Sequence, residues 1–535
     1  MDMQKATETY NRKVTGGKSP TGMVMKILVS GILASWVFFR GVYLHMSHRW
    51  TDMMGNEHGH GARPETGDLY MLIGAGLFVV TGIFAKRWLT VAGRLIKLGG
   101  REDESHQRGT YLHDARIVAK VMDRSPGDLD IAGVPLPRDV EQQHILVAGA
   151  PGSGKSVALK AIIKTIRNRG TDGAVIHDPT GEFVSLFYNP ARDLIIDPLD
   201  ARHAPWSLWT DLMPGEEASL AKAIIPSNEG DNKYFSDAAQ ATLEVLFQQC
   251  HDIDSLVMAG LGEDTQTLIE RITNAGLGGM VGSAKTFASV RGNMGPYLRS
   301  LALLPNVRRG EGVSLKDFCE KPAGRFIFLL SNGRTRDAIA PIHQLMLNQI
   351  VSVATSLRPD PSRRVWLILD ELPTLLPSPA LATALSQGRK FGLSAVMALQ
   401  AIGQMYSRVG QHESAALLSM PKTRLILRVG DGDTAESMSA EIGERHIKRK
   451  QVSTTSNSGG QGGSSGTSTT WQDTTERAVL ASEIMSLSDL SGYLRVESTT
   501  MKVQLHWTPY PVVADDYQPV PPRALPVAPP KAQED

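Results

Sequence analysis

The stretch VAGAPGSGKSVALKAI, residues 147–162, constrains the fold more than any other part of this chain. It matches the pattern GxxxxGK[ST], in which backbone N–H groups wrap phosphates, the lysine reaches the β and γ phosphates and the hydroxyl binds Mg²⁺. An apolar strand run at 144–149 precedes the loop, and an amphipathic helix at 157–170 follows it and ends on a glycine. This context predicts a site for ATP and Mg²⁺. The predicted nucleotide-binding residues are Gly149, Ala150, Pro151, Gly152, Ser153, Gly154, Lys155, Ser156 and Val157.

A second acidic element completes such a site. The run VWLILDE, residues 365–371, is an apolar strand that ends in Asp370 and Glu371. A buried parallel strand delivers carboxylates at its carboxyl end, where ligands of α/β sheets bind. We expect Asp370 to hold Mg²⁺ through water, together with Ser156, and Glu371 to polarise the attacking water. Paired with Lys155, these acids predict an ATPase of the additional-strand type.

Other apolar runs closed by polar turns predict further strands, at 173–178, 325–331, 393–400 and 424–431. They alternate with helical stretches, which predicts an α/β fold with a mostly parallel, doubly wound sheet. Gln400 ends the 393–400 run, where such ATPases keep a polar sensor for the γ phosphate. Between two of the strands, residues 199–321 are helical in pattern, which predicts an all-helical insertion domain. Whether this insertion has a separate task or only packs stays open.

Two long apolar runs lie in the first hundred residues, at 27–46 and 69–85, and predict two transmembrane helices at about 24–46 and 69–89. Five Lys and Arg residues precede the first run and five follow the second, whereas the loop between them carries two beside four acids. The positive-inside rule therefore places both termini in the cytoplasm. Four histidines at or near the loop, His45, His48, His58 and His60, have no regular ligand spacing, so we interpret the loop as a polar loop rather than a metal site.

Net charge and cysteine content narrow the kinds of partner and of cysteine site that the chain can have. The formal net charge is +1, so overall charge does not indicate a nucleic-acid partner, and any such surface must be local. The two cysteines, Cys250 and Cys319, are far apart and show no CxxC spacing, which argues against a disulfide scaffold and against a zinc site.

The chain resembles the TraD-type coupling proteins of bacterial conjugation and type IV secretion over almost its whole length. The resemblance rests on GAPGSGKS, HDPTGEF, NPARDLIIDPLDARHAPWSLW, VWLILDELPTL, GRKFGL and LQAIGQM, and the combination with DPLDARHAPW and GRKFG is far more specific than the nucleotide motifs alone. It implies a RecA-like ATPase at the inner membrane that forms a hexameric ring. The ring would couple a relaxase-bound DNA strand to the secretion channel.

The resemblance also assigns two residue roles. The arginine of the GRKFG motif is Arg389, which it implies to be a finger that reaches the γ phosphate of a neighbouring subunit, while the strand-end glutamine is Gln400. An arginine supplied across an interface makes hydrolysis depend on assembly. The alternative reading of Arg389 and Lys390 is a solvated basic turn. Asp178 and Glu182, in HDPTGEF, could position nucleotide or a neighbouring subunit, or could shape a turn.

The predicted domain boundaries follow from these patterns. They are 1–100 for the cytoplasmic N-terminal segment and two transmembrane helices, 101–198 and 322–508 for the RecA-like domain, 199–321 for the insertion, 453–470 for a flexible Ser, Thr and Gly segment, and 509–535 for an extended, disordered Pro-rich tail. Arginines of the insertion are candidate DNA contacts, although periodic charge more often marks a solvated face: Arg291, Arg299, Arg308 and Arg309.

Three functions are compatible with this reading. The first is a motor that pumps single-stranded DNA with its relaxase through a secretion channel. The second is a substrate receptor whose assembly is switched by nucleotide without pumping. The third is an FtsK-like DNA translocase, although no C-terminal winged-helix pattern is visible. The motor is favoured because a switch would not need both the water-polarising Glu371 and the finger Arg389.

Overall fold

The computed structural model describes residues 104–524, apart from positions 123, 228–229, 231–232, 281–282 and 458–463. The predicted transmembrane helices at about 24–46 and 69–89 lie outside the described residues. Within the part of the chain that is described, no helix is both long and apolar enough to cross a membrane. The described chain divides into two compact units, one around residues 445–476 and a larger one containing residues 110–444 and the chain from 477 onward.

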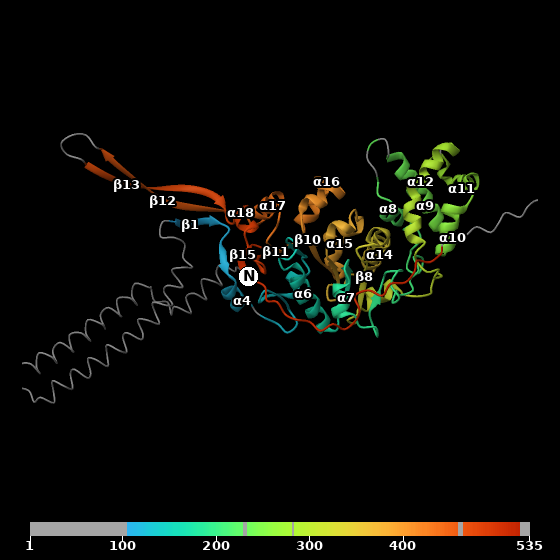
Figure 1. The fold of residues 1–535 in the computed structure, drawn as a ribbon, viewed down its shortest axis with the longest axis horizontal. Helices are drawn as coiled ribbons and strands as arrows, with labels where there is room; N and C mark the ends of the chain where they lie inside the picture. The colour runs from blue at the N-terminus through green and yellow to red at the C-terminus, as the bar shows by residue number, and fades with distance from the viewer. Residues whose placement is uncertain are drawn as a thin grey trace, which may run out of the picture. The chain divides into compact units, whose positions relative to one another are not determined.

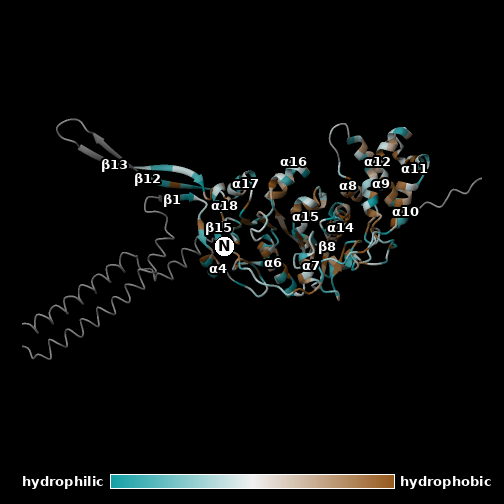
Figure 2. Cartoon of the chain, in the orientation of Figure 1, coloured by the Kyte–Doolittle hydropathy of each residue, from teal (hydrophilic) through white to brown (hydrophobic). Residues whose placement is uncertain are grey.

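The smaller unit is a three-stranded antiparallel sheet in the order β1-β12-β13. Its strands are β1 (Glu104–Gly109), β12 (Glu444–Asn457) and β13 (Ser464–Arg477). The colouring of Figure 2 shows β1 and the described part of β12 as mostly hydrophilic. Glu476 accepts hydrogen bonds from Arg445 at 2.6 Å and from Arg449 at 3.3 Å, which ties the two long strands together.

The sequence predicts a flexible segment at 453–470, and the described residues of this range belong to the strands β12 and β13. Ser and Gly led to the expectation of a linker. However, the same stretch is rich in threonine, and β-branched residues favour an extended, paired backbone. Two such stretches that pair satisfy each other's N–H and C=O groups, which a linker leaves to water.

The larger unit is built on a ten-stranded sheet in the order β2-β15-β14-β11-β5-β10-β9-β6-β8-β7. The seven strands from β11 to β7 run parallel to their neighbours, whereas β14 is antiparallel to both β11 and β15. Figure 1 shows α6 and α7 on one side of this sheet and α15 and α16 on the other. In sheet order the strands are Leu112–Asp114, Thr499–Gln504, Ser491–Val496, Thr423–Leu427, Ile145–Ala148, Leu393–Leu399, Val365–Leu369, Gly173–Asp178, Phe326–Leu330 and Leu194–Ile195.

The central strands are buried along their whole length, which is why their sequences are apolar at almost every position instead of alternating; Ser394 in β10 is the exception. The α/β prediction of a mostly parallel sheet is confirmed, and all six strand runs predicted around the site form strands. The helices and short 3₁₀ turns of this part are α4 (Ala115–Val121), α5 (Arg138–Glu141), α6 (Lys155–Arg169), α7 (Glu182–Phe187), α14 (Arg336–Ser356), η5 (Leu372–Leu375), α15 (Pro379–Gln387), η6 (Gly388–Phe391), α16 (Ile402–Ser419), α17 (Gly432–Ile442) and α18 (Ala481–Met485).

The insertion at 199–321 contains helices and no named strand in its described residues, and turns and irregular segments form 199–216 and 302–314. Its apolar core continues without a break into that of the sheet: Trp209 and Phe287 belong to the same buried cluster as Val175 of β6 and Leu345 of α14. Gln349 of α14 strengthens this connection by donating from its side chain to the carbonyl of Leu208 at 2.7 Å. The insertion is thus part of the larger unit. Its elements are α8 (Glu217–Ile224), α9 (Lys233–Gln249), α10 (Ile253–Val257), η2 (Met258–Gly262), α11 (Thr265–Ile272), η3 (Thr273–Leu277), η4 (Gly278–Met280), α12 (Ala284–Leu301) and α13 (Leu315–Glu320).

The C-terminal segment is extended, as expected, but residues 509–524 are docked instead of disordered. Figure 1 shows this segment running from β15 past α6 and α7. Val513 donates from its backbone to Ser185 at 2.8 Å, and Val520 donates to Leu199 at 2.9 Å. Further along, Arg523 donates to the carbonyl of Leu304 at 2.9 Å. Proline-rich sequence has few N–H groups of its own to satisfy, so a few specific anchors suffice to order it.

Candidate functional site: a phosphate-binding loop at the carboxyl edge of the sheet

The phosphate-binding loop connects β5 to α6 at the carboxyl edge of the sheet. Gly154 adopts φ 116°, a conformation that L side chains rarely adopt, and a Cβ there would lie 2.9 Å from Leu490. This glycine allows α6 to begin at Lys155 with its first N–H groups directed at the loop. A helix N-terminus of this kind attracts phosphate through free N–H groups and the helix dipole.

Backbone hydrogen bonds hold the loop against the neighbouring strands. Gly149 donates to Leu399 of β10 at 3.1 Å, and Ala150 donates to Arg428, just after β11, at 2.7 Å. Ser153 accepts from the backbone of Leu490 at 2.9 Å, which ties the loop to the segment before β14. The loop is therefore a shaped cradle with fixed walls before any ligand arrives.

Lys155 is 9% exposed, and its ammonium group donates to the carbonyl of Gly149 at 2.6 Å. Burial lowers the pKa of Lys155, and the carboxylates of Asp370 and Glu371 oppose that shift. β5, which leads into Lys155, and β9, which ends before the two predicted acids, are parallel and are separated only by β10, so the structure brings Lys155 and both acids to the same edge of the sheet. Ser156 is half-buried one residue into α6.

Asp370 and Glu371 follow β9, and β10 lies between β9 and the loop strand β5. This inserted strand is the feature that the additional-strand prediction requires. Burial raises the pKa of Asp370 to about 6, and Lys155 acts against this shift, while Glu371 and Glu182 add to it. Because ionising this buried carboxyl group costs free energy, a cation bound beside it would stabilise its charged form.

Gln400 directly follows β10, in the gap between the loop and the two acids. Leu399 pairs with Ala148 of β5, and Met397 pairs with Leu369 of β9. The glutamine is therefore at the level of Gly149, and β10 reaches beyond the end of β9. This register brings Gln400 to the same edge as Lys155 and Asp370.

Two charged side chains near this edge escaped the sequence analysis. Arg336, at the start of α14, lies 3.8 Å from the carboxylate of Glu371, and Lys160 of α6 pairs with Glu182 at 2.5 Å. The sequence does contain a signal for Arg336. The stretch NGRTR directly follows the strand run 325–331, so it must lie at the carboxyl end of that strand. Glu182 also contributes to the raised pKa of Asp370, which places it electrostatically within the site.

Asp178 has a local structural task. Its side chain is fully buried and accepts hydrogen bonds from the backbone N–H groups of Val184 at 2.8 Å and Thr180 at 3.4 Å, which closes the turn into α7. This geometry favours the turn-shaping alternative for Asp178. Burial raises its pKa to about 7, against the opposing effect of these N–H donors.

The raised pKa of Asp178 predicts a pH-dependent stability. Because the folded protein binds this proton more tightly than the unfolded chain, the contribution is complete below pH 4 and is lost as pH rises through about 7. We expect D178N, which keeps one acceptor oxygen and cannot ionise, to flatten the fall in unfolding free energy between pH 5 and 8 by up to a few kcal/mol. Urea unfolding at several pH values measures this slope, and equal slopes in the two proteins would contradict the assignment.

Arg389 lies at the opposite edge of the sheet. It is exposed on η6, just before β10 begins, whereas the phosphate-binding loop meets the other end of that strand. Burial lowers the pKa of His144, at the amino end of β5, to about 4, and the Arg389 charge contributes to that shift. Seven residues of β10 separate the two edges, a distance of about 20 Å. The structure therefore does not bring Arg389 to the phosphate-binding loop of its own chain.

The candidate DNA contacts in the insertion separate into two kinds. Arg291 donates to the carbonyls of Gly260 at 2.9 Å and Glu263 at 2.7 Å, so its guanidinium holds the insertion together. The other three are exposed: Arg299, Arg308 and Arg309.

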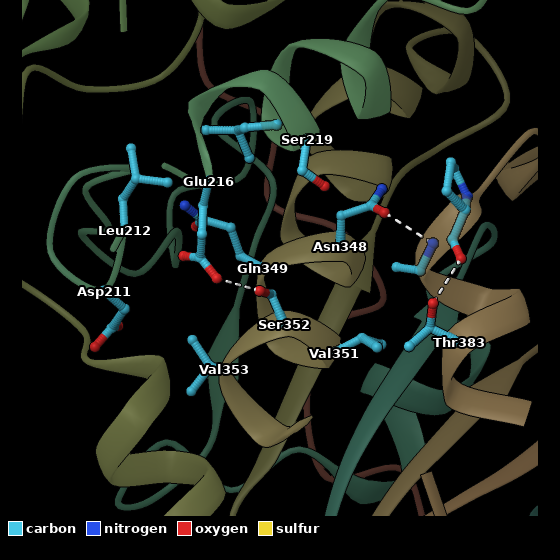
Figure 3. Close-up of a pocket in the computed structure, with 13 residues that line it drawn as sticks. Asp211, Leu212, Glu216, Ser219, Asn348, Gln349, Val351, Ser352, Val353 and Thr383 are labelled. Carbon is cyan, nitrogen blue, oxygen red and sulfur yellow. Dashed lines mark hydrogen bonds between the residues drawn. The ribbon is translucent and has the colours of Figure 1, made fainter. Parts of the chain in front are cut away.

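A cavity of about 160 Å³ opens elsewhere, between the start of the insertion and the helices α14 and α15 (Figure 3). Ser352 donates across it to Glu216 at 2.5 Å, and Asn348 accepts from the backbone of Ala380 at 3.1 Å. Its lining includes no residue of the phosphate-binding loop and neither of the acids after β9. The cavity is separate from the nucleotide site.

The phosphate-binding loop on β5, the acids after β9 and the strand inserted between them define a nucleotide-binding protein with a RecA-like fold. Within that class, this chain belongs to the family of type IV secretion-system coupling proteins, because the model of that family's DNA-binding domain matches residues 128–506. The coupling protein TraD of Escherichia coli K12 is 28% identical over 421 residues, which cover 76% of this chain and 58% of TraD. This chain therefore matches somewhat more than half of the length of that relative.

Solved structures agree with this assignment. The unbound form of the conjugative coupling protein TrwB lacking its N-terminal segment aligns with a TM-score of 0.71 at 25% identity, covering 79% of this chain and 98% of that one. TrwB in complex with ADP and Mg²⁺ aligns with a TM-score of 0.69 at the same identity, covering 79% and 100%. The resemblance to coupling proteins that the sequence motifs indicated is confirmed.

Proposed function

We propose that this protein is an inner-membrane coupling protein of bacterial conjugation that uses ATP hydrolysis to move single-stranded DNA toward a type IV secretion channel. The observation that carries the proposal is the gathering of Lys155, Asp370, Glu371 and Gln400 at one edge of the sheet in a chain of this family. The predicted N-terminal helices would anchor it with both termini in the cytoplasm, and relaxosome proteins, including the relaxase, would deliver the DNA.

ATP and Mg²⁺ fit the residues present. The loop offers N–H groups at the start of α6, and Lys155 can exchange its bond to the Gly149 carbonyl for phosphate oxygens. Ser156 and, through water, Asp370 would hold Mg²⁺, which neutralises phosphate charge. TrwB, whose fold this chain shares, has been solved with ADP and Mg²⁺ and with a non-hydrolysable ATP analogue, which supports the same ligands here.

The chain's own residues would divide the chemistry. Glu371 would orient and polarise the attacking water, and Gln400, placed between that acid and the loop, would sense the γ phosphate. Lys155 would stabilise charge on the transferred phosphoryl group. Each of these groups is supplied by a separate strand end, so hydrolysis would be sensitive to small movements of the sheet.

Arg389 would act on a neighbouring subunit. Because it lies about 20 Å from the edge that carries its own phosphate-binding loop, a direct contact with nucleotide requires a second copy. A ring of subunits, with the hexamer implied by the family resemblance, meets this requirement. The exposed arginines of the insertion would be free to contact DNA phosphates without reading bases.

A displacement assay separates the motor from a receptor that nucleotide only switches. We expect the protein to remove streptavidin from the biotinylated end of single-stranded DNA with ATP and Mg²⁺, and to fail with a non-hydrolysable analogue. The receptor would be favoured if displacement were equal with both nucleotides. It would also be favoured if the protein bound DNA normally but displaced no streptavidin with either nucleotide.

The substitution E371Q tests the water-polarising role. The amide keeps the size of the side chain but cannot accept a proton, so we expect hydrolysis to fall about a hundredfold while MgATP still binds. A phosphate-release assay and a fluorescent nucleotide titration measure the two effects. E320Q is the matched control, because Glu320 ends α13 in the insertion, and a normal rate in E371Q would remove Glu371 from the mechanism.

A further inference from the structure

We infer that His177, a buried residue of β6 with no role in the functions assigned above, is a positioning residue that holds the turn carrying Asp370 and Glu371 in its working conformation. The inference rests on the proposed function, because it concerns how that site presents its acids. His177 is 2% exposed and pairs in the sheet with Leu369, the residue just before Asp370.

The contact is direct. Nδ1 of His177 lies 2.5 Å from the backbone oxygen of Asp370. A carbonyl oxygen can only accept, so Nδ1 must carry the hydrogen and donate it. His177 is therefore fixed on one side by the Asp370 carbonyl and packs on another against the ring of His343.

A second imidazole supports the first. His343 of α14 packs edge to face against His177, with ring centroids 5.8 Å apart, and its Nε2 lies 3.2 Å from the carbonyl oxygen of Ile196. His343 is 1% exposed, so the pair forms a buried link from the turn after β9 to α14 and the segment after β7. Hydrogen bonds in such a dry environment fix geometry closely, because an unpaired partner is costly.

The backbone of Glu371 shows why the turn needs support. Its φ and ψ are 62° and 60°, a left-handed conformation that a residue with a Cβ adopts only when its surroundings impose it. On the far side, Thr374 donates to the Glu371 carbonyl from its hydroxyl at 2.8 Å and from its backbone at 3.1 Å. On the near side, His177 holds the Asp370 carbonyl. The two contacts clamp the peptide units on either side of the residue proposed to polarise water.

Side-chain replacements at position 177 distinguish positioning from packing. Asparagine places an N–H at the position of Nδ1, whereas glutamine carries its N–H one bond too far and leucine has none. The readout is the affinity for a non-hydrolysable ATP analogue, measured with Mg²⁺ and again with EDTA. The gain in affinity from Mg²⁺ reports how well Asp370 is positioned toward the metal, and it requires no hydrolysis. We expect H177L and H177Q to lose about tenfold in that gain and in kcat, with EDTA affinity within twofold of wild type, and H177N to stay within twofold throughout.

Ligand-free melting temperatures provide a readout that needs no nucleotide. H177L should melt below H177N, because it leaves the Asp370 carbonyl buried without a donor. H203L, which removes an imidazole from the loop after β7, should keep the Mg²⁺ gain. If H177L does not fold, H177N and H177Q still decide. Equal behaviour of these two, or a wild-type Mg²⁺ gain in H177L, would overturn the inference. A wild type that binds MgATP without hydrolysing it would instead overturn the proposed function.

Discussion

Replacing Lys155 with alanine is expected to reduce ATP hydrolysis about 10³-fold and to weaken nucleotide binding about 30-fold or more. Both losses have one cause. The ammonium group is buried at the start of α6 beside Asp370 and Glu371, where a phosphate contact would be shielded from water. Phosphate release and a fluorescent ADP titration measure the rate and the affinity separately.

K164A is the control for this substitution. Lys164 lies on the same helix but is exposed, and its ammonium group lies 5.2 Å from the ring centroid of Tyr510 in the docked C-terminal segment. K164A removes the same charge nine residues further along α6, so the K164A protein should hydrolyse ATP at the normal rate. A normal rate in K155A, or equal losses in both variants, would mean that the loop does not bind the reacting phosphate.

Replacing Arg389 with alanine should reduce hydrolysis about 10³-fold while leaving nucleotide affinity unchanged, because the arginine lies at the edge of the sheet away from its own loop. The neighbouring substitution K390A is the control. Lys390 is exposed on the same turn and rests over the ring of Phe391, at 4.9 Å from its centroid. It should behave as wild type.

Mixing subunits tests the direction of the Arg389 contact. R389A retains a complete phosphate-binding loop, whereas K155A retains the arginine, so neighbours of the two kinds can form working sites that neither forms alone. We expect mixtures of the two inactive variants to recover part of the activity. A mixture as inactive as its components, with assembly intact, would contradict action across an interface.

Much of the fold could be predicted from the sequence because buried parallel strands carry an unusually strong signal. The runs 365–371 and 393–400 are apolar at almost every position, with Ser394 as the exception, and end in polar residues. Both the strand and the edge that carries its functional group could therefore be read directly. The strand order was not readable in this way, since the placement of β10 between β5 and β9 depends on crossover connections.

The features that could not be predicted from the sequence depend on tertiary contacts. β14 and β15 form an antiparallel extension of the sheet, and nothing local distinguishes their pairing partners. Likewise, the Pro-rich composition after Pro509 predicts an extended backbone. It does not predict that Asp200 and Leu199 hold this segment in place through hydrogen bonds. His177 lay inside a correctly predicted strand, but its task became visible only when β9 was placed beside β6.

The proposed function requires a DNA-dependent ATPase whose site is completed by a neighbouring subunit. The most direct test is ATP turnover by the detergent-solubilised full-length protein, with and without single-stranded DNA, over a range of protein concentrations. We expect DNA to raise turnover and the rate per subunit to increase as subunits assemble. A protein that binds ATP and DNA but shows no DNA-stimulated turnover at any concentration would contradict the proposed function.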